Sequence, residues 1–197
     1  MSVERRRISR GRILQGAIEI LDLGVYGDLT VDALARSLRM SKSTLYKYFT
    51  SKDDVIVALV DAACADTEEE LAAVDRTSGR TTEVLEQLVE VLARYADRIP
   101  RAVVLQQARL PTACQDRLQL TRAAVGQALA DVLHRGVERH ELAWSDPGLA
   151  AVTFLAGADA AMKASARGEL SLDRGAAVRR LLALYRLGLV EGQRSAA

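Results

Sequence analysis

Hydrogen-bond donors and aromatic rings gather in one short stretch of the chain, from Ser41 to Lys52. Hydroxyl and ammonium groups of this kind contact phosphate oxygens and base edges in DNA complexes, so the composition fits a nucleic-acid surface. The side chains expected to meet DNA from this stretch are Ser41, Lys42, Ser43, Thr44, Tyr46, Lys47, Tyr48 and Lys52.

Two short helices and a tight turn are predicted to position these side chains. Thr30 is a good N-cap, and apolar residues recur at helical spacing in 31–38, so the first helix should stop near residue 38. Ser41 is a second N-cap type, and Leu45 and Phe49 stand four apart on one side of the next helix. In a helix-turn-helix this second helix enters the major groove.

One set of residues carries a family resemblance: Thr30-Val31, Leu34-Ala35, Ser41-Lys42, Thr44-Leu45-Tyr46, Tyr48-Phe49 and Ser51-Lys52. Over about residues 8 to 60 their spacing resembles the DNA-binding signature of the TetR family of transcriptional regulators. That family usually has Gly at the turn and again two residues into the recognition helix, where this chain has Arg39 and Ser43. Either Arg39 bears the strain of a left-handed turn or the turn closes differently, and Ser43 adds a hydroxyl that alters base preference.

Positive charge is concentrated around the proposed helix-turn-helix of residues 30–52, which is called the reader below. Residues 1–52 contain ten Lys and Arg against five Asp and Glu, about +5, whereas the rest contains seventeen against twenty-one, about −4. Arg5, Arg6 and Arg7 begin this basic segment and are expected, with Thr30, to contact phosphates or to form a minor-groove arm. The alternative is a solvated basic face.

The composition predicts an all-α protein of about nine helices, because Ala, Leu and Arg dominate and aromatic residues are few. Residues 1–52 are expected to form a three-helix DNA-binding domain, and residues 53–197 a helical ligand-binding and dimerisation domain. Beyond the reader, helices are expected over about 52–71, 83–97, 101–110, 112–139, 146–162 and 173–192. No uninterrupted apolar run approaches the ~20 residues that a membrane span needs.

Enzymatic and metal chemistry find little support in the sequence. His134 and His140 lie six apart without a cysteine or carboxylate at ligand spacing, so exposed histidines are the better interpretation. Cys64 and Cys114 are interpreted as small buried hydrophobes in a reducing cytoplasm, with a redox or ligand-reactive role as the alternative. No catalytic constellation, metal site or cofactor is predicted, and an all-α enzyme is a distant alternative.

The last helix carries an apolar stripe too wide for one neighbour, so it should be covered on two sides. The resemblance implies a two-fold dimer in which the last two helices of each copy form a four-helix bundle, and a fully internal helix is the alternative. The residues expected at this interface are Phe154, Ala158, Ala161, Leu181, Leu184, Tyr185 and Gly188.

The resemblance also implies an effector pocket among the C-terminal helices. Asp159 stands out as a carboxylate in an apolar run, so it should meet a cationic or hydrogen-bonding partner, either in the protein or in a ligand. The other residues that could line such a pocket are Tyr95, Gln106, Gln107, Arg109 and Phe154.

These features predict a cytoplasmic, homodimeric regulator that binds double-stranded DNA, most simply a repressor released from its operator by a small-molecule effector. The alternative is a constitutive dimeric DNA-binding protein without an effector. The two hypotheses differ in whether the C-terminal helices hold a ligand.

Overall fold

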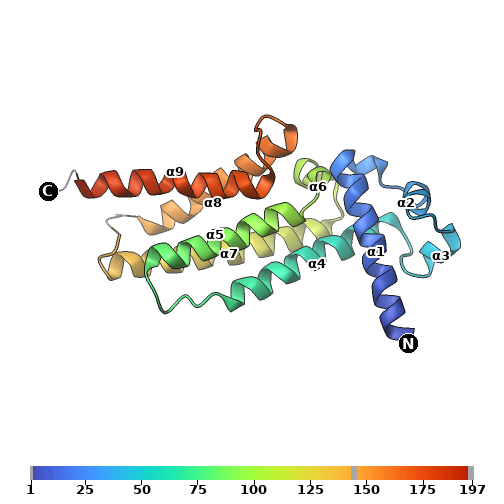
Figure 1. Ribbon diagram of the computed structural model, residues 1–197, viewed down its shortest axis with the longest axis horizontal. Helices are drawn as coiled ribbons and strands as arrows, with labels where there is room; N and C mark the ends of the chain where they lie inside the picture. Colours follow the sequence, from blue (N-terminus) through green and yellow to red (C-terminus); the bar gives the residue numbers. More distant parts are fainter. Residues whose placement is uncertain (1, 143–145, 195–197) are drawn as a thin grey trace. The chain divides into compact units, whose positions relative to one another are not determined.

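The computed structural model describes the backbone at residues 2–142 and 146–194 and the side chains at residues 10–142 and 146–185. Within these residues the chain forms nine α-helices and two 3-10 helices and contains no strand, which confirms the predicted all-α class. The helices, which Figure 1 colours in chain order, are α1 (Ser2–Leu23), α2 (Val31–Ser37), α3 (Lys42–Tyr46), α4 (Lys52–Ala73), α5 (Thr81–Arg98), α6 (Arg101–Leu105), α7 (Thr112–Glu138), α8 (Pro147–Arg167) and α9 (Arg174–Arg194), with 3-10 helices at Tyr26–Asp28 and Gln107–Arg109.

The chain divides into two compact units. Unit 1 comprises Met1–Ala63 and Ile99–Leu118, and unit 2 comprises Cys64–Arg98 and Gln119–Ala197. Helices α4 and α7 each contribute residues to both units. The predicted boundary after residue 52 separates a DNA-binding domain from a ligand-binding and dimerisation domain. This division by function stays a prediction.

Unit 1 packs around the apolar faces expected from the sequence. Ile13 of α1, Leu45 of α3 and Ile56 of α4 are fully buried, and Leu34 of α2 is 1% exposed. Burying a side chain of this size contributes about 1.5–3 kcal/mol, so these few contacts hold the short helices α2 and α3, which would not be stable alone.

Side-chain caps fix where the short helices begin. The Thr30 hydroxyl accepts a hydrogen bond from the backbone N–H of Ala33 at 3.0 Å, and the Ser41 hydroxyl accepts one from Thr44 at 3.1 Å. Both residues were expected as N-caps, and both expectations are confirmed. Each cap is worth about 1 kcal/mol, which matters for helices of two turns or fewer.

The turn between α2 and α3 places Arg39 in the left-handed region, with φ of 52°. The backbone N–H of Arg39 donates to Arg36, and that of Met40 donates to Ala35 at 2.9 Å. This pair of hydrogen bonds is the Schellman ending, which usually has glycine at the left-handed position. Of the two alternatives for the turn, Arg39 therefore bears the strain.

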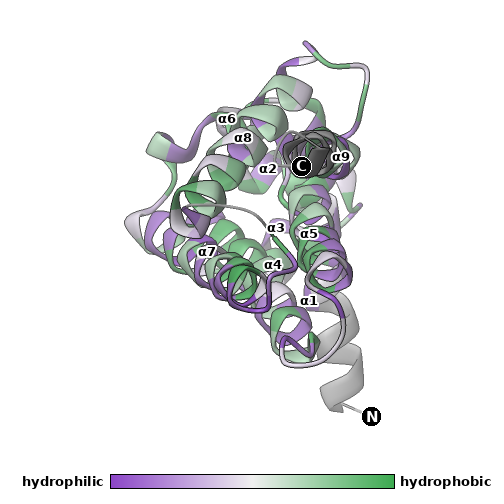
Figure 2. Ribbon diagram, turned by 90° about the vertical axis from the view of Figure 1, so that its left-hand side faces the viewer, coloured by the Kyte–Doolittle hydropathy of each residue, from purple (hydrophilic) through white to green (hydrophobic). Residues whose placement is uncertain are grey.

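Unit 2 is a set of helices in which α9 packs against both α5 and α8. The Asp146 side chain accepts a hydrogen bond from Leu149 at 2.8 Å and starts α8, which ends at the left-handed Gly168. Figure 2 shows hydrophilic and hydrophobic residues on different sides of α5 and α7, as expected for helices with one packed face. Leu88 and Ala93 of α5 are fully buried.

The helix expected over 101–110 is interrupted. It ends at Leu105, and Gln106, with φ of −124°, separates α6 from a 3-10 turn. The remaining predicted ranges match the observed helices within a few residues.

Among the described helices, only α8 has the length and apolar composition that a membrane crossing would need. Helices packed in the core of water-soluble proteins have the same length and composition. In this structure α8 packs against α9, and its Phe154 and Ala158 are 5% and 2% exposed.

Candidate nucleic-acid interface and apolar pocket

Helix α3 ends at Tyr46, so Phe49, which was expected on this helix, lies in the segment that follows it. Leu45 and Phe49 together form the buried support beneath the polar side chains. Leu45 is 0% and Phe49 3% exposed, whereas Lys42, Ser43 and Lys47 are exposed. Tyr46 is 51% exposed, a high value for a ring of its size. The helix therefore has the division between packed and free faces that a groove-binding helix needs.

Three hydroxyl groups at the start of α3 form one hydrogen-bonded group. The Ser41 oxygen lies 3.0 Å from the Ser43 hydroxyl and 2.8 Å from the Thr44 hydroxyl. Because Ser41 also caps the helix, its position is fixed by the backbone. These hydrogen bonds hold the three hydroxyl groups in fixed positions at the N-terminus of α3. In a helix-turn-helix, the N-terminus of the second helix is the part that meets base edges.

Two cations of unit 1 lie over aromatic rings. The guanidinium carbon of Arg10 is 4.9 Å from the centre of the Phe49 ring, and the Lys52 ammonium is 4.5 Å from the centre of the Tyr26 ring. Contacts of this kind contribute about 0.5–1 kcal/mol at exposed sites. Lys52 therefore has a packing role that its predicted phosphate contact did not include.

Tyr26 joins three segments of unit 1. Its hydroxyl donates to Asp53 at 2.8 Å, and its backbone N–H donates to the Gln106 side chain at 3.1 Å. Burial, followed by the hydrogen bond and charge of Asp53, raises the pKa of Tyr26 well above its ordinary value. Gln106, predicted for a ligand pocket, is thus engaged by the loop that precedes α2.

The remaining predicted DNA contacts are distributed as follows. Thr30 is exposed and acts as an N-cap, and Tyr48 is half-buried. The backbone of Arg5, Arg6 and Arg7 lies in α1, and their side chains lie outside the described residues. Their roles, and those of the α3 side chains, stay predictions.

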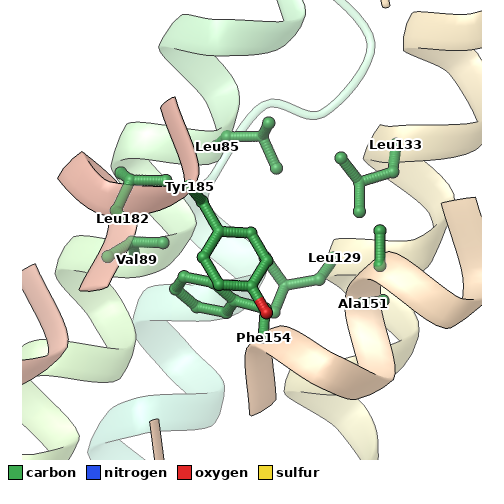
Figure 3. A pocket seen from close by; sticks show the side chains of 9 residues that line it. Leu85, Val89, Leu129, Leu133, Ala151, Phe154, Leu182 and Tyr185 are labelled. Atoms are coloured by element: carbon green, nitrogen blue, oxygen red, sulfur yellow. The ribbon is translucent and has the colours of Figure 1, made fainter. Parts of the chain in front are cut away.

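An apolar cavity of about 30 Å³ lies within unit 2, between α5, α7, α8 and α9 (Figure 3). Phe154 and Tyr185 meet edge to face in its wall, with ring centres 5.2 Å apart and planes at 85°. The exposed surface of its lining is apolar. The lining residues are Leu85, Val89, Leu129, Leu133, Ala150, Ala151, Phe154, Leu182 and Tyr185.

Of the residues predicted to bind a ligand, only Phe154 lines this cavity. Tyr95, in α5, is half-buried, and burial raises its pKa well above the ordinary value. Gln107 and Arg109 are exposed in unit 1. Periodicity could have identified the aliphatic lining as packed, but it does not show where packing leaves a gap.

Asp159 has two cationic partners within unit 2. Its carboxylate lies 2.7 Å from the Lys163 ammonium and 3.4 Å from the Arg122 guanidinium. The side chain is 29% exposed. These contacts supply the protein partner expected for this carboxylate, and contact with a ligand stays a prediction.

The residues predicted for a dimer interface fall into two groups. Phe154 and Ala158 are buried within unit 2, whereas Leu184 is 60% exposed and Ala161 and Leu181 are half-buried. Tyr185 is engaged by Phe154, and the surroundings of Gly188 lie outside the described side chains. An exposed apolar face also runs along α8, through Leu149 and Val152, which are 58% and 65% exposed. The dimer stays a prediction.

No group of three potential metal ligands occurs among the described residues. Cys64 and Cys114 are buried and form no disulfide. His134 is exposed, with its Nδ1 2.9 Å from the Ala130 carbonyl oxygen, and His140 is exposed at the end of α7. Both histidines are therefore placed as expected.

Comparison with known proteins matches residues 13–59 to a family model described as bacterial regulatory proteins, tetR family. A search of curated proteins found no match. Among solved structures, the TetR-family transcriptional regulator PfmR from Thermus thermophilus is 22% identical, with a TM-score of 0.72 over 90% of this chain and 97% of that one.

Two further structures of the same fold contain ligands. A putative transcriptional regulator from Saccharomonospora viridis, in complex with choline, is 19% identical, with a TM-score of 0.74 over 91% of this chain and 96% of that one. The transcriptional regulator FadR from Bacillus subtilis, in complex with stearoyl-CoA, is 17% identical, with a TM-score of 0.62 over 88% and 95%.

Proposed function

Because the chain is a TetR-family transcriptional regulator, we propose that it binds a specific operator as a homodimer and is released when a small molecule binds. The observation that carries the proposal is α3, a capped helix with polar residues exposed above the buried Leu45 and Phe49. Operator binding by such a protein represses transcription where the operator overlaps a promoter. Its site of action is the cytoplasm.

The proposed DNA contacts of α3 and its neighbouring segments divide into two roles. Lys42, Ser43, Thr44, Tyr46 and Lys47 face base edges in the major groove. The N-terminal arginines, Thr30, Ser41, Tyr48 and Lys52 fix the position of the reader on the phosphates and contribute affinity that does not depend on sequence.

Helix α4 is the proposed link between effector and DNA. It starts directly after the reader and continues along the chain into unit 2, which contains the apolar cavity. A dimer must place its two recognition helices about 34–36 Å apart, so a change in this spacing weakens binding to successive grooves. A coupling of about 1–3 kcal/mol changes operator affinity about 5- to 150-fold.

The cavity supports an apolar effector or an apolar part of one. All nine lining residues present carbon, and two relatives of this fold hold organic ligands. The cavity is only about 30 Å³, so an effector of ordinary size either extends out of it or displaces lining side chains. Displacement of packed side chains gives the binding event a means of moving helices.

The first experiment is fluorescence anisotropy of the protein on DNA from upstream of its own reading frame and on scrambled DNA, across a salt series. A specific regulator should prefer one duplex by 10³-fold or more, and its affinity should fall steeply with salt. Equal binding to every upstream and genomic duplex would contradict sequence-specific regulation.

Two substitutions separate the proposed roles. Lys52→Ala should weaken binding to all duplexes and flatten the salt dependence by about 0.9 in slope, whereas Lys42→Ala or Ser43→Gly should change which duplex is preferred. A changed preference in Lys52→Ala at constant salt slope would contradict this division.

The competing function is a constitutive DNA-binding protein whose C-terminal helices only dimerise. A thermal-shift screen with hydrophobic compounds separates the two, since a ligand present at 100 times its Kd stabilises the folded state by about 2.7 kcal/mol. A stabilising compound that also releases DNA supports an effector. Failure of every stabilising compound to change DNA affinity would favour the constitutive protein.

A further inference from the structure

The two helices of the reader are joined by an ion pair between Asp32 and Lys42. The Lys42 ammonium lies 2.7 Å from the Asp32 carboxylate, and the two side chains are 59% and 56% exposed. Exposed pairs of this kind add little to stability, because water screens them. The pair therefore matters for which DNA groups the Lys42 ammonium contacts, and not for the stability of the fold.

The backbone on both sides of this pair is fixed. Asp32 is the second residue of α2, behind the Thr30 cap, and Lys42 is the first residue of α3, behind the Ser41 cap. Buried Leu34 and Leu45 hold the two helices in unit 1. The Lys42 side chain is flexible, so its ammonium can contact either the Asp32 carboxylate or acceptor groups on DNA.

An ammonium group has three N–H donors and no acceptor. With one donor given to Asp32, two remain, and in the major groove they match the O6 and N7 acceptors of guanine. A lysine without such an anchor is a mobile point charge that binds any phosphate in reach. The Asp32 carboxylate, 2.7 Å from the Lys42 ammonium, thus favours contact of Lys42 with a guanine edge over contact with phosphates.

We propose that Asp32 is a positioning residue that aims Lys42 at a guanine edge and withholds its charge from phosphates. The inference rests on the proposed function of sequence-specific DNA binding. On non-operator DNA the paired Lys42 contributes little, because its charge is already compensated. On the operator it reads a base, so Asp32 widens the difference in affinity between the two kinds of DNA.

The test begins with selection of the preferred duplex from a random-sequence DNA pool by the wild-type protein. Asp32→Asn should bind a scrambled duplex about 5-fold more tightly near 0.1 M salt, because a like charge near the phosphates is gone. The released Lys42 adds one phosphate contact, so the salt slope on scrambled DNA should steepen by about 0.9. Affinity for the selected duplex should change less, so the specificity ratio falls.

Two control variants isolate the pair. Glu19→Gln removes an equal, exposed charge from α1 and should leave the specificity ratio unchanged. In a Lys42→Met background, Asp32→Asn should no longer steepen the salt slope, because no ammonium is released. Thermal unfolding of each variant confirms that it is folded.

A modified base tests the proposed target. Replacing the critical guanine of the selected duplex by 7-deazaguanine removes the N7 acceptor and should weaken wild-type binding about 5- to 10-fold, but Asp32→Asn binding less. The proposal is wrong if Asp32→Asn leaves the salt slope and the specificity ratio unchanged, or if both duplexes tighten equally. If the wild-type protein selects no sequence, the proposed function itself fails, and this inference fails with it.

Discussion

Arg39 and His140 occupy the same left-handed position at the ends of two different helices, with φ of 52° and 58°. The N–H of His140 donates to Val137, and the next N–H, of Glu141, donates to Gly136 at 2.8 Å, as Arg39 and Met40 do at the end of α2. Helix α8 ends in the same way, but with Gly168 at φ of 77°.

The Arg39→Gly variant should be more stable than the wild-type protein by about 0.5–1 kcal/mol. Glycine removes the steric cost of the left-handed Cβ, roughly 1–2 kcal/mol, and gives part of it back as unfolded-chain entropy. Urea denaturation measures the difference, and His140→Gly is the matched variant at the other exposed site. A destabilised Arg39→Gly protein would mean that the arginine side chain stabilises the turn.

The carboxylate of Glu70 in α4 accepts hydrogen bonds from Arg94, at 2.9 Å, and from Arg98 of α5. Burial by itself would raise the pKa of Glu70, but the two arginines outweigh it and leave the pKa below its ordinary value. A carboxyl group with a lowered folded-state pKa stabilises the protein above its unfolded pKa, 4.5 for Glu, and loses that contribution as pH falls through the folded value.

The Glu70→Gln variant should therefore lose about 1 kcal/mol at neutral pH, and its deficit should shrink as the pH is lowered below about 4.5. Urea denaturation at a series of pH values measures this change. Glu138→Gln, which alters an exposed carboxylate of α7, is the control and should follow the wild-type curve. A deficit that persists unchanged to low pH would assign the loss to packing.

The Leu129→Ala variant should be destabilised by about 2–5 kcal/mol, because it removes a buried side chain and enlarges the existing cavity. Leu120→Ala makes the same change on α7 at a side chain that is 64% exposed, and should cost less than about 0.5 kcal/mol. The enlarged apolar space should also bind a small apolar probe such as benzene, detected as a rise in Tm. Equal losses in the two variants would contradict the packing described for α7.

The Tyr26→Phe variant should lose about 1 kcal/mol, the net contribution of its hydrogen bond to Asp53. Because the folded-state pKa of Tyr26 is raised above 10, ionisation of the unfolded chain destabilises the wild-type protein as pH rises past that value. Tyr26→Phe should reduce this alkaline loss, as measured by urea denaturation between about pH 9 and 11. In an Asp53→Asn background, Tyr26→Phe should lower the free energy of unfolding at neutral pH by less, since the hydrogen bond between residues 26 and 53 is already altered.

The local features of the fold were predictable because each depends on a few neighbouring residues. Thr30 and Ser41 are short polar side chains before apolar repeats, and both cap helices as expected. Leu45 and Phe49, four apart, are both buried as expected. The turn at Arg39 was narrowed to two alternatives, and the hydrogen bonds of Met40 decide between them.

Contacts between distant residues were not predictable in the same way. Gln106 was expected within a helix over 101–110 and as a residue that could line a pocket, yet its side chain accepts a hydrogen bond from the backbone N–H of Tyr26, eighty residues earlier. The Asp32 contact of Lys42 depends on the crossing of two helices, which periodicity does not give. The cavity beside Phe154 depends on side-chain volumes from four helices, so no single segment predicts it.

The hydrogen bond between Tyr26 and Gln106 also bears on how the protein is made. Unit 1 is discontinuous, since Met1–Ala63 is completed by Ile99–Leu118. A ribosome adding about 5–20 residues per second needs roughly 4–16 s to extend the chain across the eighty residues between these partners. During that interval the nascent Met1–Ala63 segment lacks the contacts that Ile99–Leu118 supplies, so unit 1 as described here is completed only after both segments have been made.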